Sequence, residues 1–272
     1  MLPDVQTRAP DIKISLTRVG VSEVRKLLKI PRNGDRPIVL LANFSCFVDL
    51  PSSQKGTHMS RNLEAINEII EEIVDKPVYE LEGLCGDMVR EVLKRHSYAS
   101  RCEVEMESQL MMMRDTPSGK KEQEFVKLIA RSTAYRNKKP SIEREIGAEV
   151  KGLLLHPHAK GGPSPGCGQT AEASLVIQIP EGSQVKIEEI VDVLESAMSS
   201  KAYSFLTEAE EKLALLNACK SPKSTGDAVD DILREAEKRF AHLSGMKATA
   251  KCRARDSLFT FDSYAEGETV IS

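Results

Sequence analysis

The 272-residue sequence contains no tryptophan, and aromatic residues make up only 4% of it. Proteins that bind single-stranded nucleic acid stack bases on aromatic side chains, so this scarcity argues against that class. Basic residues are not in excess either, because the net charge is −3 and Lys and Arg are spread along the chain. We therefore expect no nucleic-acid partner. Phosphate ligands are not excluded, because they need only a few basic residues in one place.

Long apolar runs are also missing. The longest, residues 37–48, is interrupted and too short to cross a bilayer, and the first residues show no signal sequence. We expect a cytoplasmic protein with no membrane partner. The six cysteines form no Cys-x-x-Cys pair, which is typical of reduced thiols in a reducing compartment.

Apolar residues make up 40% of the chain and charged residues 29%, which suits one large or two small globular domains. Periodicity predicts strands and helices in a repeated order, with residues 122–134 ambiguous between the two. The expected strands are 12–19, 36–48, 99–106, 142–155, 173–179, 247–255 and 258–264, and the expected helices begin near 60, 80, 187, 203 and 227.

Each half of the chain therefore contains two strands, then helices, then two strands. The halves share no sequence identity, so the repeat is one of pattern and indicates two similar α+β modules. The best boundary is the Asn137-Lys-Lys-Pro140 segment, which gives an N-terminal module over 1–138 and a C-terminal module over 139–272. A sheet covered by helices on one face leaves its other face to bury, which favours a homo-oligomer.

One stretch gathers potential metal ligands in a Gly- and Pro-rich segment. It runs from His156, which follows the apolar run ending at Leu155, through His158 to Cys167, just before the next apolar segment. Two strand ends would hold these ligands near one point. His-x-His with a distant Cys is a weak metal signature, and a polar surface loop with an inert thiol is the alternative.

A second stretch, Asp49 to Arg61, places Lys55, His58 and Arg61 between a strand and a helix N-terminus. Cationic side chains and exposed backbone N–H groups at such a point can hold an anion such as phosphate. An ordinary polar connection capped by Ser60 is the alternative.

Two acidic runs lie on expected helices. One of Glu208, Glu210 and Glu211 could turn inward as a metal ligand or general base, although such runs are usually solvated. Asp227 lies in a run that opens the last expected helix, where compensation of the helix dipole alone would explain it.

Several of these segments resemble the type IB GTP cyclohydrolases, especially their archaeal branch. The resemblance rests on Ser15 to Val21, Phe47 to Arg61 and Ile146 to Val150, and it extends over nearly the whole chain. It implies tandem tunnelling-fold modules, each a four-stranded antiparallel sheet with helices on one face, assembled as a homotetramer or homodimer. It also implies metal-assisted hydrolysis of GTP, with imidazole-ring opening and formate release, toward a dihydroneopterin cyclic phosphate for pterin cofactor synthesis.

The resemblance implies a metal site that this sequence builds differently. His156-Pro-His158 stands where the family has Cys-Pro-Cys, and Cys167-Gly-Gln-Thr170 stands where it has His-Asn-Gln-Arg. The metal ligands become His156, Cys167 and Glu211, with His158 to orient a ligand or move a proton and Asp227 as a second catalytic group. Lys55, His58 and Arg61 become candidates for triphosphate or base contacts. One divalent metal is expected per site, Fe²⁺ or Zn²⁺, with Mn²⁺ as a further candidate.

Other positions depart from the family pattern. Its second glutamate falls at Gly226, beside Asp227, and its C-terminal His-Asp-Ala-Phe motif reads Phe261-Asp-Ser-Tyr264. Loss of acid–base groups costs about 10²–10⁴-fold in rate. The alternative is therefore a diverged paralogue that binds a purine or pterin without cyclohydrolase activity, or that acts on a different pterin-like substrate.

Overall fold

The computed structural model describes residues 14–30, 38–53, 63–69, 71, 81–137, 142–155, 168–255 and 260–272. Its strands are β1 (Leu16–Ile30), β2 (Ile38–Leu50), β3 (Arg101–Asp115), β4 (Lys121–Tyr135), β5 (Ile142–Leu155), β6 (Gly168–Ile179), β7 (Ser200–Lys201), β8 (Lys247–Arg255) and β9 (Asp262–Val270). Its helices are α2 (Leu81–Arg95), α3 (Ile187–Ser196), α4 (Glu208–Ala218), α5 (Thr225–Arg239) and the 3₁₀ turn η3 (Ala241–Leu243), with residues 63–69 also helical.

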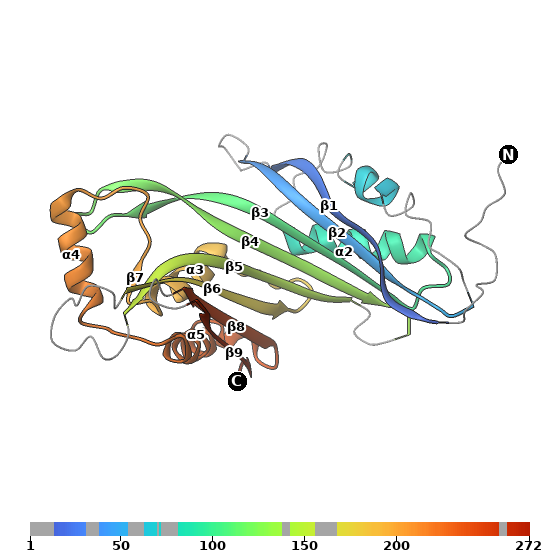
Figure 1. Cartoon of the computed structure of the whole chain (residues 1–272). Helices are drawn as coiled ribbons and strands as arrows, with labels where there is room; N and C mark the ends of the chain where they lie inside the picture. The colour runs from blue at the N-terminus through green and yellow to red at the C-terminus, as the bar shows by residue number, and fades with distance from the viewer. Residues whose placement is uncertain are drawn as a thin grey trace. The chain divides into compact units, whose positions relative to one another are not determined.

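All of these strands belong to one nine-stranded sheet. The order of hydrogen-bonded neighbours is β1-β2-β3-β4-β5-β6-β8-β9, and β7 pairs with β5 (Figure 1). The chain nevertheless forms two compact units, one of Met1–Ser108 with Ile129–Ile146 and the other of Gln109–Leu128 with Gly147–Ser272.

The predicted architecture of tandem four-stranded modules is wrong. β4 and β5, which lie on either side of the predicted break, are hydrogen-bonded neighbours within the single sheet. Periodicity identifies strands but does not reveal which strands pair across a connection, so it could not show that the sheet is continuous. Residues 138–141 lie outside the described residues, and the domain boundary at 138/139 stays a prediction.

In the first unit, α2 buries one face. Its buried side chains recur at helical spacing and include Leu84, Met88, Val89 and Val92. The strands contribute Phe44 and other fully buried residues to the same unit.

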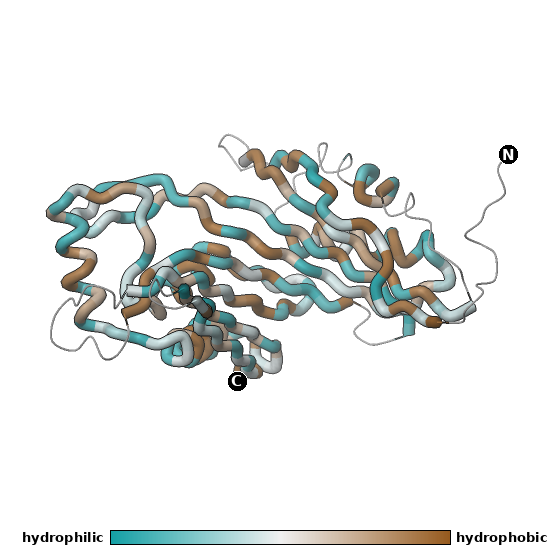
Figure 2. The backbone as a smooth tube through the Cα atoms, viewed as in Figure 1, coloured by the Kyte–Doolittle hydropathy of each residue, from teal (hydrophilic) through white to brown (hydrophobic). Residues whose placement is uncertain are grey.

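In the second unit, every second residue of β6 and β8 is buried, and the residues between them are exposed or half-buried. Figure 2 shows the hydropathy of the residues along the backbone. The buried face of β8 carries only small residues, namely Ala248, Ala250, Cys252 and Ala254. α5 packs against β8 and β9, and α3 packs against β6 and α5. The other face of these strands carries the charged residues.

The order of strands and helices along the chain agrees with the prediction except for the two-residue strand β7, which was not predicted, and the ambiguous stretch at 122–134 is a strand, β4. The first strand was placed too early. β1 runs on to Ile30, and two register irregularities, between Leu16 and Val19 and between Val21 and Val24, break the alternation that would reveal it. The last strand also starts later than predicted, because β9 has few apolar residues.

The described part of the chain contains no helix that is both long and apolar enough to span a membrane.

Candidate active site

Four strand ends meet at one end of the sheet in the second unit. A Cβ atom built on Gly168, at the start of β6, would lie 3.3 Å from Leu153 Cδ1 and 3.7 Å from Leu155 Cδ2, at the end of β5. Thr170 of β6 is opposite Arg255 at the end of β8, and Arg255 is opposite Asp262 at the start of β9. The end of β5, the start of β6, the end of β8 and the start of β9 therefore lie together.

Leu155 is fixed at this end by two hydrogen bonds of its backbone. Its N–H donates to Ser199 Oγ at 3.1 Å, and its carbonyl accepts from Lys223 N–H at 2.8 Å. Ser199 precedes β7, which pairs with β5 through Gly152 opposite Lys201. These bonds connect the end of β5 to the segments that lead into α4 and α5.

The predicted ligands His156 and Cys167, and His158 between them, lie outside the described residues. Their described sequence neighbours are Leu155 and Gly168, the two residues shown above to be adjacent. The structure thus brings together the end of β5, which His156 follows, and the start of β6, which Cys167 precedes.

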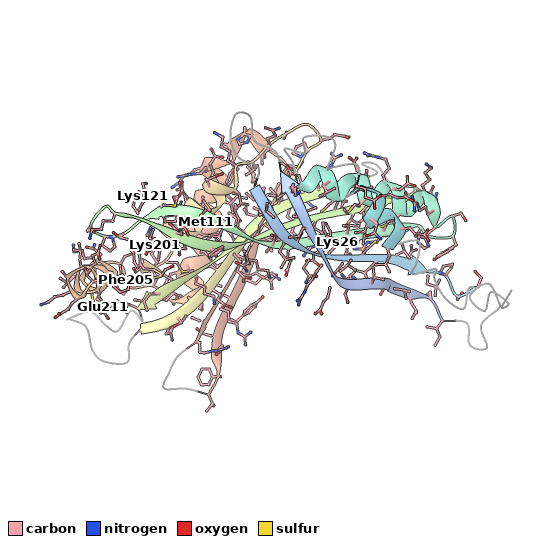
Figure 3. All side chains as sticks on the ribbon, turned by 90° about the horizontal axis from the view of Figure 1, so that it is seen from above. Lys26, Met111, Lys121, Lys201, Phe205 and Glu211 are labelled. Atoms are coloured by element: carbon pink, nitrogen blue, oxygen red, sulfur yellow. The ribbon has the colours of Figure 1, made fainter. Side chains whose placement is uncertain are left out.

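α4 carries the third predicted ligand, Glu211. The helix begins after Thr207, whose side chain accepts a hydrogen bond from Glu210 N–H in a capping box. α4 packs against β7, and the Glu211 side chain is exposed one turn before Ala214 (Figure 3). α4 therefore contacts the short strand that pairs with Gly152 and Leu153 of β5.

The neighbouring carboxylate, Glu210, has a structural role. It is buried, and it accepts hydrogen bonds from Thr207, from Thr116 Oγ1 at 3.0 Å and from Ser118 Oγ. The hydrogen bond from Ser118, followed by those from Thr207 and Thr116, lowers the pKa of Glu210 to about 2. Glu210 therefore ties α4 to the turn between β3 and β4, and Glu211 is the residue of this pair that faces solvent.

A pocket of about 400 Å³ lies among α3, β7 and α4. Lys201 Nζ lies 5.2 Å from the ring centroid of Tyr203 there, and burial raises the pKa of the Tyr203 hydroxyl. The lining residues are Asp192, Glu195, Ser196, Met198, Ser199, Ser200, Lys201, Tyr203, Ala214 and Asn217.

Asp227, predicted as a catalytic group, caps α5. Its Oδ2 accepts from Ser224 N–H at 2.8 Å and from Ser224 Oγ at 2.7 Å, and its own N–H donates to Ser224 Oγ at 3.1 Å. The backbone hydrogen bond from Ser224, followed by the hydroxyl bond, lowers the pKa of Asp227. A carboxylate with a lowered pKa is a weaker base, and this one is engaged in holding the helix end.

The open face of the sheet has a second pocket, of about 240 Å³, at the same strand ends. The residues that line it are Lys151, Thr170, Glu172, Arg253, Arg255 and Asp262. Sequence reasoning did not single out Arg253, Arg255 or Lys151. The alternation of Lys247 to Arg255, with cations on one face and Ala or Cys on the other, was the signal that could have found the two arginines.

The predicted substrate contacts Lys55, His58 and Arg61 lie outside the described residues. Just before them, Asp49 accepts hydrogen bonds from the N–H groups of Ser100 and Arg101, each at 2.8 Å. The described residues therefore fix the end of β2, from which the predicted anion-binding stretch continues.

Positions that depart from the family pattern lie at the same end of the second unit. Among the described residues, a Cβ atom at Gly226 would meet only Ser224 Oγ, at 3.7 Å, which is an ordinary contact distance. Phe261 is 64% exposed beside the start of β9. Within the described ranges, no three His, Cys, Asp or Glu side chains are grouped closely enough to hold a metal. Two of the three predicted ligands are not among those ranges, so the ligand set stays a prediction.

The chain is similar to solved urate oxidases in fold. A uricase from Arthrobacter globiformis superposes with a TM-score of 0.57 over 93% of both chains at 8% identity. Urate oxidase from Bacillus sp. TB-90 gives 0.52 over 94% of this chain and 100% of the other at 13% identity. At such identities the likeness shows the fold alone: the nine-stranded sheet is uricase-like, which overturns the predicted tandem tunnelling-fold modules.

Sequence comparison gives a narrower result. The chain is 36% identical to the GTP cyclohydrolase MptA of Methanothermobacter thermautotrophicus, over 97% of this chain and 92% of the relative. It is 34% identical to that of Methanoculleus marisnigri, over 100% and 96%. The family model described as type I GTP cyclohydrolase folE2 matches residues 2–265, a description that differs from the type IB label of the sequence resemblance. With full-length relatives above 30% identity and a family model that spans almost the whole sequence, this chain belongs to the type I GTP cyclohydrolase folE2 family.

Proposed function

We propose that this protein is a metal-dependent GTP cyclohydrolase that opens the imidazole ring of GTP and releases C8 as formate. The product would be a dihydroneopterin cyclic phosphate for pterin cofactor synthesis. The observation that carries the proposal is the adjacency of Leu155 and Gly168 in a member of this family. The helix that bears Glu211 packs on β7, which pairs with β5.

The residues fit a divalent metal in the chemistry of their donors. A His, a Cys and a Glu form a ligand set that suits Zn²⁺ and Fe²⁺ alike and leaves a position open. The described geometry is compatible with this set, because the residues that flank His156 and Cys167 are adjacent and α4 packs on β7, which pairs with β5. A metal bound there would supply Lewis-acid chemistry, which makes water nucleophilic near neutral pH.

The remaining roles are assigned to this chain's own side chains. His158 would take up and return protons near the reacting carbon, since an unperturbed imidazole titrates near neutral pH. Lys55, His58 and Arg61 would contact the triphosphate or the base. Asp227 is predicted to be a catalytic group, but its hydrogen bonds to Ser224 in the capping box of α5 argue against that role. Variants of Asp227 and Ser224 are compared in the Discussion to decide between the two roles.

The test is the metal content of anaerobically purified protein, measured together with formate release from GTP. We expect one metal ion per site, and formate in proportion to GTP consumed. Bound metal without formate release would mean that the protein acts on another substrate. The absence of both bound metal and formate release would overturn the proposal.

A second candidate is a diverged paralogue that binds a purine or pterin without this activity, or acts on a different pterin-like substrate. It is favoured by the exposed Phe261 in place of an imidazole and by the engagement of Asp227 in a helix cap. GTP binding without formate release would support the first form, and a product of different mass would support the second.

A homotetramer or homodimer remains part of the proposal. In the second unit, three large apolar side chains that alternate along β3 and β4 are exposed: Met111, Met113 and Phe125. Exposed apolar groups on one sheet face are typical of surfaces that another chain covers.

A further inference from the structure

The pocket on the open face of the sheet has an all-polar lining. Among the described residues, its walls are charged side chains and one hydroxyl, with no aliphatic or aromatic residue. Sites for purine bases are lined mainly by hydrophobic and aromatic side chains, and none of the described lining residues is of that kind. Its volume of about 240 Å³ is also below the range typical of sites that enclose a whole drug-sized ligand. The pocket therefore suits one polar group of a larger molecule.

The charges of the lining decide the sign of that group. The lining holds three cations, Lys151, Arg253 and Arg255, against two carboxylates, Glu172 and Asp262. Among the described lining residues, the excess of one positive charge favours an anion and opposes a metal cation.

The two arginines differ in how closely they contact Asp262. Arg253 Nε lies 2.7 Å from Asp262 Oδ2, a hydrogen-bonded ion pair, and the Asp262 side chain is 19% exposed. Arg255 Nε lies 3.6 Å from Asp262 Oδ1, too far for a hydrogen bond, and its side chain is 77% exposed. Asp262 thus holds Arg253, while Arg255 keeps its guanidinium directed to solvent at the mouth of the pocket.

Lys151 and Thr170 complete the anion-binding set. Lys151 Nζ lies 3.8 Å from Glu172 Oε1, again beyond hydrogen-bond distance. Thr170 is opposite Arg255 in the ladder between β6 and β8, so its hydroxyl and the Arg255 guanidinium line the same pocket. A planar guanidinium, an ammonium and a hydroxyl are the donors that bind phosphate oxygens.

We propose that this pocket is a subsite for a phosphate group of the nucleotide, with Arg255 as its main contact and Lys151 and Thr170 as supporting donors. The proposal rests on the proposed function for the identity of the nucleotide, and on the pocket alone for the phosphate. It does not depend on Lys55, His58 or Arg61, which lie outside the described residues.

The test is the binding of inorganic tripolyphosphate to the purified protein, measured by calorimetry. Arg255→Gln removes the charge and the guanidinium fork from an exposed position, and we expect binding at least about 10-fold weaker. Arg255→Lys keeps the positive charge but lacks the guanidinium fork, so its affinity for tripolyphosphate should lie between those of the unmodified protein and Arg255→Gln. The matched control is Lys251→Gln, because Lys251 lies on the same strand and face, pairs with Glu266 at 3.0 Å and does not line the pocket. It should stay within about twofold of the unmodified protein.

Formate release from GTP separates this proposal from the proposed function. If Arg255→Gln weakens tripolyphosphate binding and the unmodified protein releases no formate, the subsite stands and the GTP reaction does not. If formate is released but Arg255→Gln changes neither tripolyphosphate affinity nor the KM for GTP, the subsite is overturned and the activity stands. Equal losses in Arg255→Gln and Lys251→Gln would also overturn it, since they would indicate diffuse attraction to the charged face.

Discussion

α4 and α5 both begin with a capping box, yet they are held in different ways. α5 buries Ala228, Val229, Ile232 and Ala236 and packs on β8 and β9. α4 buries mainly Glu210, Ala214 and Ala218 and leaves its leucines exposed. One helix is fixed by apolar packing along its length, and the other by polar contacts at its first turn.

This difference bears on Glu211. It lies next to Glu210, whose hydrogen bonds to Thr116 and Ser118 connect the first turn of α4 to the turn between β3 and β4. The predicted metal ligand is therefore positioned by its neighbour's hydrogen bonds more than by packing. A rigid support of this kind is what a ligand on a weakly packed helix requires.

The largest effect is expected at Glu211. Glu211→Ala should remove a metal ligand, so that bound metal and formate release fall by at least about 100-fold while folding is retained, because the side chain is exposed. The matched control is Glu208→Ala, which removes the same charge from an exposed position in the same turn. Elemental analysis and a formate assay measure the result, and unchanged metal content in Glu211→Ala would remove this residue from the site.

The next largest effect is a loss of stability, which should be greater for a truncation in α5 than for one in α4. Ile232→Ala empties a fully buried position in α5 and should lower the free energy of unfolding by about 2–5 kcal/mol. Leu216→Ala changes a side chain of α4 that is 50% exposed and should stay within about 0.5 kcal/mol. Urea unfolding of both variants measures the contrast. Similar losses in the two would mean that α4 is packed as tightly as α5 in the assembled protein.

The sequence predicted most elements of the second unit because its strands alternate between apolar and polar residues and its helices show apolar periodicity. Lys247 to Arg255 shows the alternation. The caps Thr207 and Ser224 were not recognised, and the helices predicted to begin near 203 and 227 begin at Glu208 and Thr225. The prediction failed at β1, where register irregularities interrupt the alternation of apolar and polar residues. It also failed for the architecture of the sheet, which depends on the pairing of β4 with β5.

For the candidate site, the sequence predicted which strand ends lie together but not which side chains are engaged there. Adjacent apolar strands indicated that the residues after Leu155 and before Gly168 would lie near one another, and the described flanks agree. The sequence could not distinguish Glu210 from Glu211 by pattern alone, because partners 92 and 94 residues away decide which carboxylate is engaged. Nor could it show that Arg255 and Asp262 share a pocket, which depends on register between strands.

The hydrogen bonds of Glu210 predict a dependence of stability on pH. Its pKa falls from an ordinary 4.5 to about 2 in the folded protein, so the unfolded chain takes up the proton first. The stabilisation is fully present above pH 4.5 and is lost as the pH falls toward 2. Glu210→Gln should therefore be less stable than the unmodified protein at pH 7, and the gap should narrow between pH 4.5 and 2. The control is Glu208→Gln, and a gap that is constant with pH would contradict the role of ionised Glu210.

The smallest effect is expected at the α5 cap, and it also tests whether Asp227 is catalytic. Ser224→Ala should lower the free energy of unfolding by about 1 kcal/mol, because it removes the side chain that accepts from Asp227 N–H. Asp227→Asn should cost about as much, since it removes the charged acceptor of the same box. We expect the two variants to match in kcat for formate release as well, because a carboxylate with a lowered pKa that is bound to Ser224 is a poor proton acceptor. Urea unfolding and steady-state kinetics on both variants measure this. A kcat for Asp227→Asn that falls about 10²-fold or more below that of Ser224→Ala would show instead that Asp227 transfers a proton, since general acid–base groups contribute rate factors of that size.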